Sequence, residues 1–549
     1  MVSRKTFSKS AYLIYKQCPR YFWYYINNRE SIPEPDLRTK FNFRLGHIIG
    51  DIAKKYFPEG IEVGYEGDFD QNLKRTQLLL EKRFPLYEAG LLFKDDYYDV
   101  YSRADVLFPS EFAQNSNILE VQEYKESGLK EKCWDIIEVK SSTGVKDVNL
   151  FDVAFQKYCY KNAGLNIKNC FIMYINNQYI RDESIDVKEL FTISDVTDAV
   201  SKIVPHIKND LRQMLKVASN ENFIYDEIQP EDMVGKFCDS PFNCPLKTKC
   251  WEKVSSKSIF NLYAITNKTI SRLYARNIKF IDQIPEEFEG MSDKQKIQIG
   301  CVKNSDHHIN REELRNYLKK IKYPLYFLDF ETFSSPVPLI CGTRPYQNIP
   351  FQFSLHILKN PDGTPTHRSF LSSGDYDPRN ELLENLRREF GFGEGVSFGG
   401  SVIVYNESFE RAILRDLAAH SPEHASWIYM IMANIVDLYE PFKNFHYYNR
   451  LQNGSASVKK VLPALTGKSY SNLAITNGDT ASISFLEKSR LWKDFIKSGF
   501  FNVSENFIQD ELDEEEEIKK IRGNLEQYCK LDTEGMLSIL KELDSLILK

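Results

Sequence analysis

Apolar runs that contain single charged residues mark the first predicted core of this chain. Residues 136–140, Ile-Ile-Glu-Val-Lys, have the pattern of a short buried strand, and the apolar run at residues 101–108 contains one acid, Asp105. Because side chains alternate along a strand, Glu138 and Lys140 are expected on one face. That pairing indicates either a solvated ion pair at a sheet edge or a site that uses both groups.

A second strand with two acids on one face is predicted near the middle of the chain. Residues 326–333, Tyr-Phe-Leu-Asp-Phe-Glu-Thr-Phe, alternate so that Asp329 and Glu331 point to the same side. Phenylalanine and leucine surround both carboxylates, and a purely structural reason for two acids in such a strand is hard to find. These two residues are therefore the strongest candidates for a functional site in the second half.

Two further segments of the second half place polar groups on predicted helices. Residues 401–406 read as a strand that runs into a helix, and this helix carries Glu410. Near the end of the chain, Tyr528 and Asp532 are four residues apart on a helical pattern, so they are expected on one face. A core tyrosine and a helix-surface ion pair are the structural alternatives for Tyr528 and Glu410.

The length of 549 residues predicts two or three domains, each able to bury a core. The pattern becomes helical after about residue 253 and remains so to about residue 320. Two short helices predicted there are similar to helix-hairpin-helix modules but lack the hairpin glycines, which favours a plain helical linker. The expected domains are residues 1–254, a helical linker over 255–320, and residues 321–549.

Composition and charge indicate which compartment and which kinds of partner to expect for the protein. Hydrophobic residues make up 42% and charged residues 27% of the chain, and no apolar run reaches the roughly 20 residues of a membrane span. The N-terminus lacks the apolar core of a signal peptide, so we expect a cytoplasmic protein without a membrane partner. A net charge of −6 argues against indiscriminate coating of nucleic acid, but it is compatible with a local basic groove.

The ten cysteines fall into two groups. Six are scattered and are interpreted as small core residues: Cys133, Cys159, Cys170, Cys301, Cys341 and Cys529. The other four suit one metal centre, because Cys238, Cys244 and Cys250 are evenly spaced among prolines and Cys18 supplies a fourth thiol. Four thiolates hold either an iron–sulfur cluster or structural zinc.

The motifs of the first half resemble the RecB-type branch of the PD-(D/E)xK nucleases. They occur in the order of that family: His47, Asp105, Glu138 with Lys140, and Gln156 with Tyr160. The resemblance implies a restriction-endonuclease-like domain in which the histidine and the two acids ligate a divalent metal. It further implies that the lysine contacts phosphate or water and that the glutamine and the tyrosine position the substrate.

The placement of the four cysteines, one before this nuclease core and three after it, also resembles a known arrangement. AddB-type and CRISPR-associated RecB-like nucleases carry an iron–sulfur staple with this layout. The resemblance implies that Cys18, Cys238, Cys244 and Cys250 hold a 4Fe–4S cluster, with zinc as the rival metal. Either metal would close a very long loop of the chain.

The motifs of the second half resemble the DnaQ-like (DEDD) exonucleases of the tyrosine subtype, which have an RNase H-like fold. The resemblance implies that Asp329, Glu331 and Asp532 bind two Mg²⁺ or Mn²⁺ ions and that Tyr528 orients the attacking water. Glu410 would be a further metal ligand, at a position where that family usually has aspartate.

Together these resemblances predict an α/β protein that is a metal-dependent DNA nuclease with two active sites, acting in repair, recombination or defence. The alternatives are an RNA-processing 3′–5′ exonuclease, which would use the same DEDD motifs, and a nucleic-acid-binding scaffold in which one site has decayed. Comparison of cleavage on matched DNA and RNA distinguishes the first alternative, and metal-dependent turnover distinguishes the second.

Overall fold

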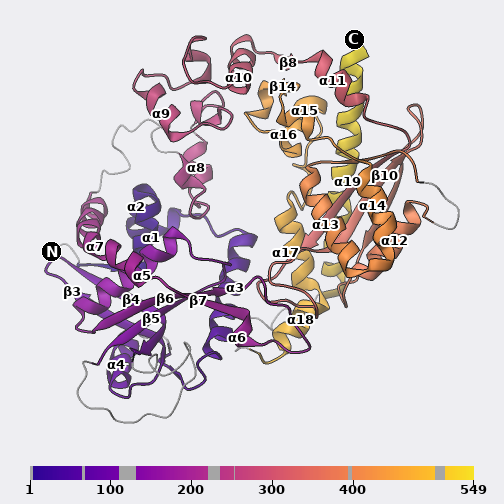
Figure 1. Ribbon diagram of the computed structural model, residues 1–549. Coiled ribbons are helices and arrows are strands. Elements are labelled where there is room, and N and C mark those ends of the chain that lie inside the picture. The colour runs from indigo at the N-terminus through magenta and orange to yellow at the C-terminus, as the bar shows by residue number, and fades with distance from the viewer. Residues whose placement is uncertain are drawn as a thin grey trace. The chain divides into compact units, whose positions relative to one another are not determined.

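The computed structural model describes residues 4–64, 69–110, 132–220, 235–252, 254–392, 398–500 and 514–548. These residues form two compact units (Figure 1). The first consists mainly of residues 1–253 together with residues 335–346, and the second of residues 254–334, 347–498 and the C-terminal helix. Both units combine helices with a β-sheet, so the expected α/β class is confirmed.

The first unit is built around a seven-stranded sheet with the order β2-β3-β4-β5-β6-β7, in which β1 pairs with β4. Its strands are β1 (Lys5–Ser8), β2 (Ile61–Glu62), β3 (Leu86–Lys94), β4 (Tyr98–Pro109), β5 (Trp134–Lys140), β6 (Ile167–Ile175) and β7 (Phe191–Asp195). Its helices are α1 (Lys9–Gln17), α2 (Pro19–Asn27), α3 (Leu37–Lys54), α4 (Phe69–Leu80), α5 (Asp147–Asn162), α6 (Val187–Leu190), α7 (Thr197–Ser219) and α8 (Lys247–Trp251).

Strand β5 lies inside this sheet, antiparallel to β4 and parallel to β6. Its first five residues are buried, and its last two, Val139 and Lys140, are partly exposed. Helix α5 packs on the sheet and is buried on all sides from Asp152 to Tyr160, and its Val153 and Phe155 belong to the main core of the unit. The strands predicted around Asp105 and Glu138 and the helix predicted around Gln156 are therefore confirmed.

Residues 335–346 follow a strand of the second unit in sequence but belong to the first unit. The guanidinium group of Arg181 donates hydrogen bonds of 2.9 Å to the carbonyl oxygens of Pro338 and Leu339. The hydroxyl group of Tyr346 donates to the carbonyl oxygen of Ser141, which directly follows Lys140 in sequence. This segment therefore lies next to the end of β5.

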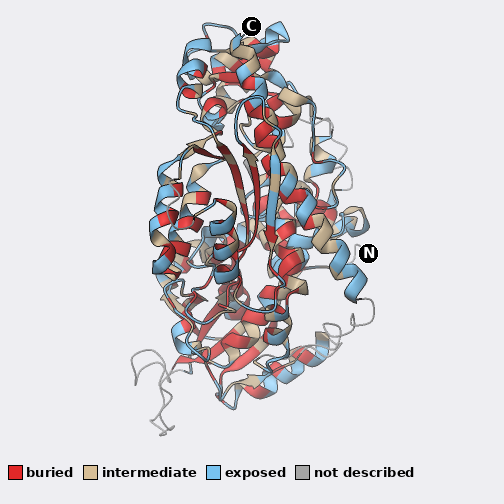
Figure 2. Cartoon of the chain, turned by 90° about the vertical axis from the view of Figure 1, so that its right-hand side faces the viewer, coloured by how far each residue is buried: buried red, intermediate tan, exposed pale blue. Residues whose placement is uncertain are grey.

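The second unit is built around a five-stranded sheet with the order β11-β10-β9-β12-β13. Its strands are β9 (Leu325–Phe333), β10 (Ile349–Leu358), β11 (Thr366–Leu371), β12 (Ser401–Val404) and β13 (Ile435–Asp437). The pairs among β11, β10 and β9 are antiparallel, and β12 is parallel to both β9 and β13. The central strands β9, β10 and β12 are largely buried, whereas the edge strand β11 is mostly exposed (Figure 2).

Helices surround this sheet and extend the second unit. They are α9 (Asn267–Tyr274), α10 (Asp293–Asn304), α11 (Arg311–Leu318), α12 (Arg379–Glu389), α13 (Glu407–His420), α14 (Ala425–Ala433), α15 (Glu440–Lys443), α16 (Val458–Thr466), α17 (Gly478–Lys488), α18 (Arg490–Lys497) and α19 (Glu514–Leu548). The long helix α19 packs against β9 and β10. It thereby brings Tyr528 and Asp532 to the strand that carries Asp329 and Glu331.

The region expected as a linker, residues 255–320, has a small apolar cluster of its own that includes Ile259, Leu273 and Ile299. It is also joined to later parts of the unit, because β8 (His307–Ile309) pairs with β14 (Tyr447–Asn449). In the structure this region is therefore an integral part of the second unit. Within the described parts of the chain, no helix combines the length and apolar character needed to cross a membrane.

The scattered cysteines do not all lie in the core. Four of the six are buried: Cys159, Cys170, Cys301 and Cys529. Cys133 is half-buried, and the interpretation is wrong for Cys341, which is exposed in the segment that follows β9. That segment is irregular backbone between β9 and β10, and it leaves the Cys341 side chain outside the core.

Candidate functional site

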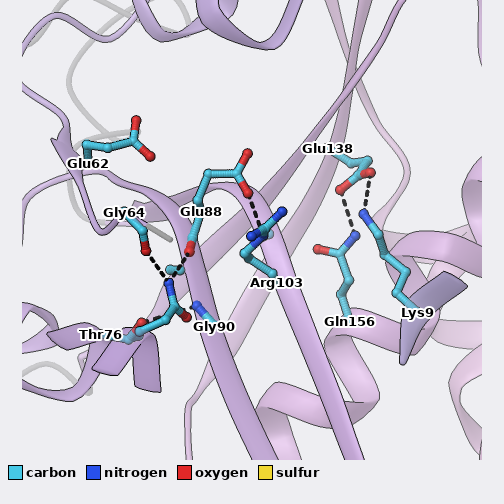
Figure 3. Close-up of polar contacts among 12 residues, drawn as sticks. Lys9, Glu62, Gly64, Thr76, Glu88, Gly90, Arg103, Glu138 and Gln156 are labelled. Carbon is cyan, nitrogen blue, oxygen red and sulfur yellow. Dashed lines mark hydrogen bonds and ion pairs between the residues drawn. The ribbon is translucent and has the colours of Figure 1, made fainter. Parts of the chain in front are cut away.

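The first site is centred on Glu138, which is 1% exposed at the end of β5. Its Oε1 atom accepts hydrogen bonds from Lys140 Nζ at 2.6 Å and from Lys9 Nζ at 2.7 Å. Its Oε2 atom accepts a bond of 2.7 Å from Gln156 Nε2. Lys9 and Gln156 thus reach Glu138 from two different helices (Figure 3). Glu138 and Lys140 lie on one face of the strand, as predicted.

A second buried acid, Asp152 on α5, completes this charged group. Lys140 Nζ lies 2.7 Å from its Oδ2 atom, and Lys9 Nζ lies 3.3 Å from its Oδ1 atom. Gln156, one helical turn later, donates to the same Oδ1 atom at 3.0 Å. Lys9 and Asp152 were missed from the sequence. For Asp152, the sequence offered one signal: it lies four residues before Gln156, and so on the same face of the predicted helix.

Asp105 projects from β4 next to this group. Its Oδ2 atom accepts a 2.8 Å hydrogen bond from the backbone N–H of Val139, which holds the carboxylate against β5. Glu88 on β3 lies close enough for its charge to raise the pKa of Asp105 and is paired with Arg103 at 2.6 Å (Figure 3). The strands therefore collect carboxylates of β3, β4 and β5 in one place.

Burial and mutual repulsion of the acids change the proton affinities in this site. Burial raises the pKa of Glu138 to about 7, and the neighbouring Asp105 and Asp152 carboxylates add to the shift. The pKa of Asp152 moves the other way: burial would raise it, but Lys140 and Lys9 outweigh burial and hold it below its ordinary value. The same carboxylates keep the pKa of Lys140 above normal although burial alone would lower it.

The remaining residues of the first motif set have different environments. Tyr160 is completely buried; its hydroxyl donates to the carbonyl oxygen of Ala89 at 2.5 Å and accepts from the N–H of Ala104 at 2.8 Å. This hydroxyl links β3 and β4 directly beside Asp105, and the positioning of substrate by Tyr160 remains a prediction. His47 is exposed on α3, and no hydrogen bond or ion pair joins it to the acids of this site among the described residues.

Gln156 is also fully buried, and its amide nitrogen bonds to two carboxylates and not to an open surface. The positioning of substrate by Gln156 remains a prediction. Its role in the described site is to orient Glu138 and Asp152, because one amide group can bridge both acids. The sequence pattern gave the correct helix face but not the partner of the side chain.

The four cysteines of the predicted metal centre converge in the first unit. Burial raises the pKa of the Cys244 thiol to about 12, and the nearby Cys18, Cys238 and Cys250 raise it as well. Cys18 also lies near Cys238 and Cys250, at the N-terminus of α2, where the N–H groups of Arg20 and Tyr21 oppose the effect of burial on its pKa. Thiols more than 200 residues apart in sequence thus lie in one site.

Protein contacts hold this convergence independently of a metal. Gln17, next to Cys18, is buried, and its Nε2 atom donates to the carbonyl oxygens of Phe237 at 2.8 Å and Phe242 at 2.6 Å. Cys244 belongs to a small apolar cluster with Trp23, Tyr24 and Leu246. Helices α1 and α2 are therefore fixed to the segment that contains residues 237–246.

The second site collects acids from β9, α13 and α19. One ligand atom each of Asp329, Glu331 and Cys529 lie within 4.8 Å of one another. Glu410 on α13 is 2% exposed and accepts a hydrogen bond from the backbone N–H of Phe330, which places it at the same strand. Its Oε2 atom has no hydrogen-bond partner among the described residues.

Asp532 joins this group from α19. Its Oδ1 atom accepts a 2.6 Å hydrogen bond from the hydroxyl of Tyr470, and Tyr528 also donates to the carboxylate. Lys459 Nζ lies 5.6 Å from the ring centre of Tyr528 and 5.9 Å from that of Tyr470. The predicted common face of Tyr528 and Asp532 is confirmed. Tyr470, Lys459 and the buried thiol of Cys529 were missed.

The acids of the second site all resist ionisation. Burial raises the pKa of Asp329, Glu331 and Glu410 well above their ordinary values, and repulsion between neighbouring carboxylates adds to each shift. Burial likewise raises the pKa of Asp532 to about 6, although both tyrosine hydroxyls and Lys459 oppose it. The first site contains two lysines among its acids, whereas this one has four acids whose negative charge is opposed by Lys459.

Comparison with known proteins gives matches of limited extent. Residues 326–457 match the family described as "Domain of unknown function (DUF2779)". The chain is 26% identical over 261 residues to "Uncharacterized protein MG366" of Mycoplasma genitalium, which covers 43% of this chain and 34% of that protein. It is also 26% identical over 263 residues to "Uncharacterized protein MG366 homolog" of Mycoplasma pneumoniae. That match covers 45% of this chain and 34% of that protein. The chain thus spans about a third of the length of these relatives.

Proposed function

We propose that this protein is a divalent-metal-dependent nuclease with two active sites that cleaves phosphodiester bonds of DNA. The observation that supports the proposal most is the cluster formed by Asp329, Glu331, Glu410 and Asp532. Four buried acids with raised pKa values are costly for a fold to hold together without a compensating charge. Divalent cations supply such a charge, and two ions held by carboxylates are the usual centre for phosphodiester hydrolysis.

The residues of the second site fit Mg²⁺ or Mn²⁺. All four acids offer the oxygen atoms that these ions prefer, and the unpartnered Oε2 atom of Glu410 is a buried acceptor that a cation would satisfy. When bound, the ions would stabilise the charge that develops on the phosphate oxygens. Tyr528, whose hydroxyl contacts Asp532, would orient the attacking water, and Lys459 would reduce the repulsion among the acids. This unit is proposed to have an RNase H-like fold.

The first site is proposed to cleave by PD-(D/E)xK chemistry on a restriction-endonuclease-like fold. Asp105 and Glu138 come from neighbouring antiparallel strands, and both present carboxylates to one space. They would hold a divalent cation, and the exposed His47 on α3 remains a candidate ligand. Lys140, which already lies among these acids, would stabilise the negative charge of the transition state.

Cleavage of end-labelled oligonucleotides tests the proposal. The full chain is incubated with matched single-stranded DNA, double-stranded DNA and RNA in Mg²⁺, in Mn²⁺ and in EDTA. We expect metal-dependent cleavage of DNA, with single-stranded DNA as the preferred substrate. Preferred cleavage of RNA would instead identify an RNA-processing enzyme, and binding without turnover in either metal would identify a scaffold.

Replacement of Tyr528 by phenylalanine tests the proposed role of its hydroxyl group. We expect the second-site rate to fall by about 10²-fold, as for other groups that position a proton or a water molecule. Metal affinity should change little, because the carboxylates remain. The measurement is single-turnover cleavage together with Mn²⁺ titration, in a chain whose first site is silenced by Lys140→Ala. Replacement of the exposed Tyr429 by phenylalanine is the matched control.

The four-cysteine centre is proposed to hold a 4Fe–4S cluster formed by Cys18, Cys238, Cys244 and Cys250. Their mutual proximity fits a group bound by four thiolates, and the N–H groups at the start of α2 favour the ionised form of Cys18. The cluster would fix α1 and α2 to the segment that follows the nuclease core. We propose that the functional division follows the boundaries stated from the sequence, 1–254, 255–320 and 321–549, except that residues 335–346 belong to the first unit.

Metal analysis of anaerobically purified protein tests this centre. We expect about four iron atoms per chain, broad absorption near ~400 nm, and loss of both in Cys250→Ser. The variant should also unfold at a lower temperature, because the thiols join distant parts of the chain. Cys170→Ser is the control, since Cys170 belongs to the main core and is not one of the four cysteines of the centre. Stoichiometric zinc without iron would contradict the cluster and indicate a structural zinc site.

A further inference from the structure

Lys9 is a charged residue of the first site that none of the sequence motifs includes. It is the first residue of α1, and its side chain is 22% exposed. Its ammonium group lies 2.7 Å from Glu138 Oε1 and 3.3 Å from Asp152 Oδ1 (Figure 3). An N-terminal helix thus contributes a cation directly to the two acids at the centre of the site.

The two lysines of this site share one oxygen atom. Glu138 Oε1 accepts from both Lys9 and Lys140, and Oε2 is occupied by Gln156. Both acceptor positions of Oε1 are thus filled, so a divalent cation that binds this oxygen atom has to displace one of the two lysines. Lys140 is held by a second contact of 2.7 Å to Asp152, whereas the corresponding contact of Lys9 is 3.3 Å. Lys9 therefore gives up less ion-pair energy than Lys140 would when it moves away from the acids.

The helix that carries Lys9 is fixed along its length. The hydroxyl of Tyr12 donates to Asp210 on α7 at 2.9 Å, and Lys16 contacts the same carboxylate at 3.2 Å. At the end of the helix, Gln17 bonds to the two carbonyl groups beside the cysteine centre. The backbone of Lys9 is therefore held in place, while its four-carbon side chain can move its charge over several ångströms.

We propose that Lys9 is a second phosphate-binding lysine of the N-terminal nuclease site. Before metal binds, its ammonium group pairs with Glu138. Glu138 would hold a divalent cation in place of this pairing, and Lys9, released from the carboxylate, would contact a phosphate group of the DNA strand. This inference rests on the proposed nuclease function of the site, and it assigns Lys9 two opposite effects: it competes with the metal and it attracts the substrate.

A lysine that serves only as a counter-ion for buried acids would behave differently. Its removal would lower stability or change metal affinity, but it would leave DNA affinity and the cleavage rate at saturating metal unchanged. The proposal instead requires that the two affinities move in opposite directions in the same variant. That combination is the measurement that separates the two roles.

The experiment uses the full chain with the second site silenced by Asp329→Asn and Asp532→Asn. In this background Lys9→Gln is compared with Lys16→Gln, a matched control on the same helix. Glutamine can still donate a hydrogen bond to Glu138, so the carboxylate does not lose every partner at that oxygen. Mn²⁺ binding is followed by electron paramagnetic resonance, DNA binding by fluorescence anisotropy with Ca²⁺, and cleavage by single turnover at saturating Mn²⁺.

For Lys9→Gln we expect Mn²⁺ affinity to rise several-fold, DNA affinity to fall several-fold, and the cleavage rate to fall by about 10²-fold. Lys9→Arg, which keeps the charge, should restore DNA affinity, and it replaces Lys9→Gln as the test if the latter does not fold. The cleavage rate of Lys9→Arg should nevertheless stay below that of the parent, because the planar guanidinium group places its charge differently from an ammonium group. Lys16→Gln should match the parent in all three measurements.

Unchanged DNA affinity and cleavage in Lys9→Gln would overturn the proposal while leaving the nuclease function intact. A parent chain that neither binds Mn²⁺ nor cuts DNA would instead show that the proposed function of this site is wrong, and the role of Lys9 with it. If Lys9→Arg is the variant measured, a cleavage rate equal to that of the parent overturns the specific role of the ammonium group.

Discussion

Replacement of Asp329 by asparagine is expected to abolish nearly all activity of the second site, with a loss of roughly 10³-fold or more. Asp329 lies on β9 beside Glu331, and both carboxylates and the Cys529 thiol are within 4.8 Å of one another. Removing this carboxylate deletes a ligand from the centre of the group, so the site should lose a metal ion. The measurement is the ladder of shortened products from a 5′-labelled strand, in a chain that also carries Lys140→Ala.

The same substitution should have the opposite effect on stability in the absence of metal. Burial and repulsion hold the pKa of Asp329 well above normal, so its carboxylate destabilises the fold when ionised. A raised folded-state pKa contributes stability at low pH that is lost as pH rises past it. In EDTA near pH 8, asparagine should therefore raise the melting temperature, whereas added Mn²⁺ should stabilise the parent more than the variant.

Replacement of the exposed Asp362 by asparagine is the matched control for both measurements, since Asp362 lies in the turn after β10. It should leave the product ladder and the melting temperature unchanged. If Asp329→Asn and Asp532→Asn both retained full cleavage with the first site silenced, the second unit would bind nucleic acid without cutting it. A site of that kind would still require an explanation for its four buried acids.

The parts of these sites that could be predicted from the sequence are those that lie on one element. Alternation along β9 placed Asp329 and Glu331 on one face, and the same rule paired Glu138 with Lys140 on β5. The helical repeat placed Tyr528 next to Asp532. In each case a local periodicity of the backbone determines the geometry, and no tertiary information is needed.

The residues that were missed come from other elements. Lys9 lies 129 positions before Glu138 and reaches it only because α1 packs against α5. Tyr470 bonds to Asp532 from a loop between α16 and α17. No periodicity relates such positions, because their contacts depend on how helices pack on the finished sheet. The same reason explains Tyr160, whose face was correct but whose hydroxyl proved to be used by β3 and β4.

The domain division shows a related limit. Residues 335–346 directly follow β9, so their sequence position assigns them to the second unit. Their hydrogen bonds, including those from Arg181, place them in the first. A short irregular segment has no hydrophobic pattern that would reveal which core it joins. Sequence order reveals a domain boundary only where the chain passes from one domain to the next a single time.

Replacement of Lys140 by alanine is expected to remove cleavage at the first site, by roughly 10²- to 10³-fold, while DNA affinity falls only slightly. Lys140 lies 2.6 Å from Glu138 and 2.7 Å from Asp152, inside the group of acids, where its charge can act on the reacting phosphate. Lys9 and Gln156 still bond to both acids in the variant, which should preserve the fold. The measurement is single-turnover cleavage at saturating Mn²⁺ in the Asp329→Asn background.

A matched substitution separates the chemistry of Lys140 from its charge alone. Lys161→Ala removes an exposed lysine from the last turn of α5 and should leave cleavage unchanged. Lys140→Arg keeps a cation among the acids, but its planar fork places the charge differently, so it should recover DNA binding more fully than cleavage. If Lys140→Ala cut as fast as the parent, the lysine would serve only as a counter-ion for Glu138 and Asp152. Cleavage at this site would then depend on Lys9 as the remaining cation, and Lys9→Gln would become the more damaging change.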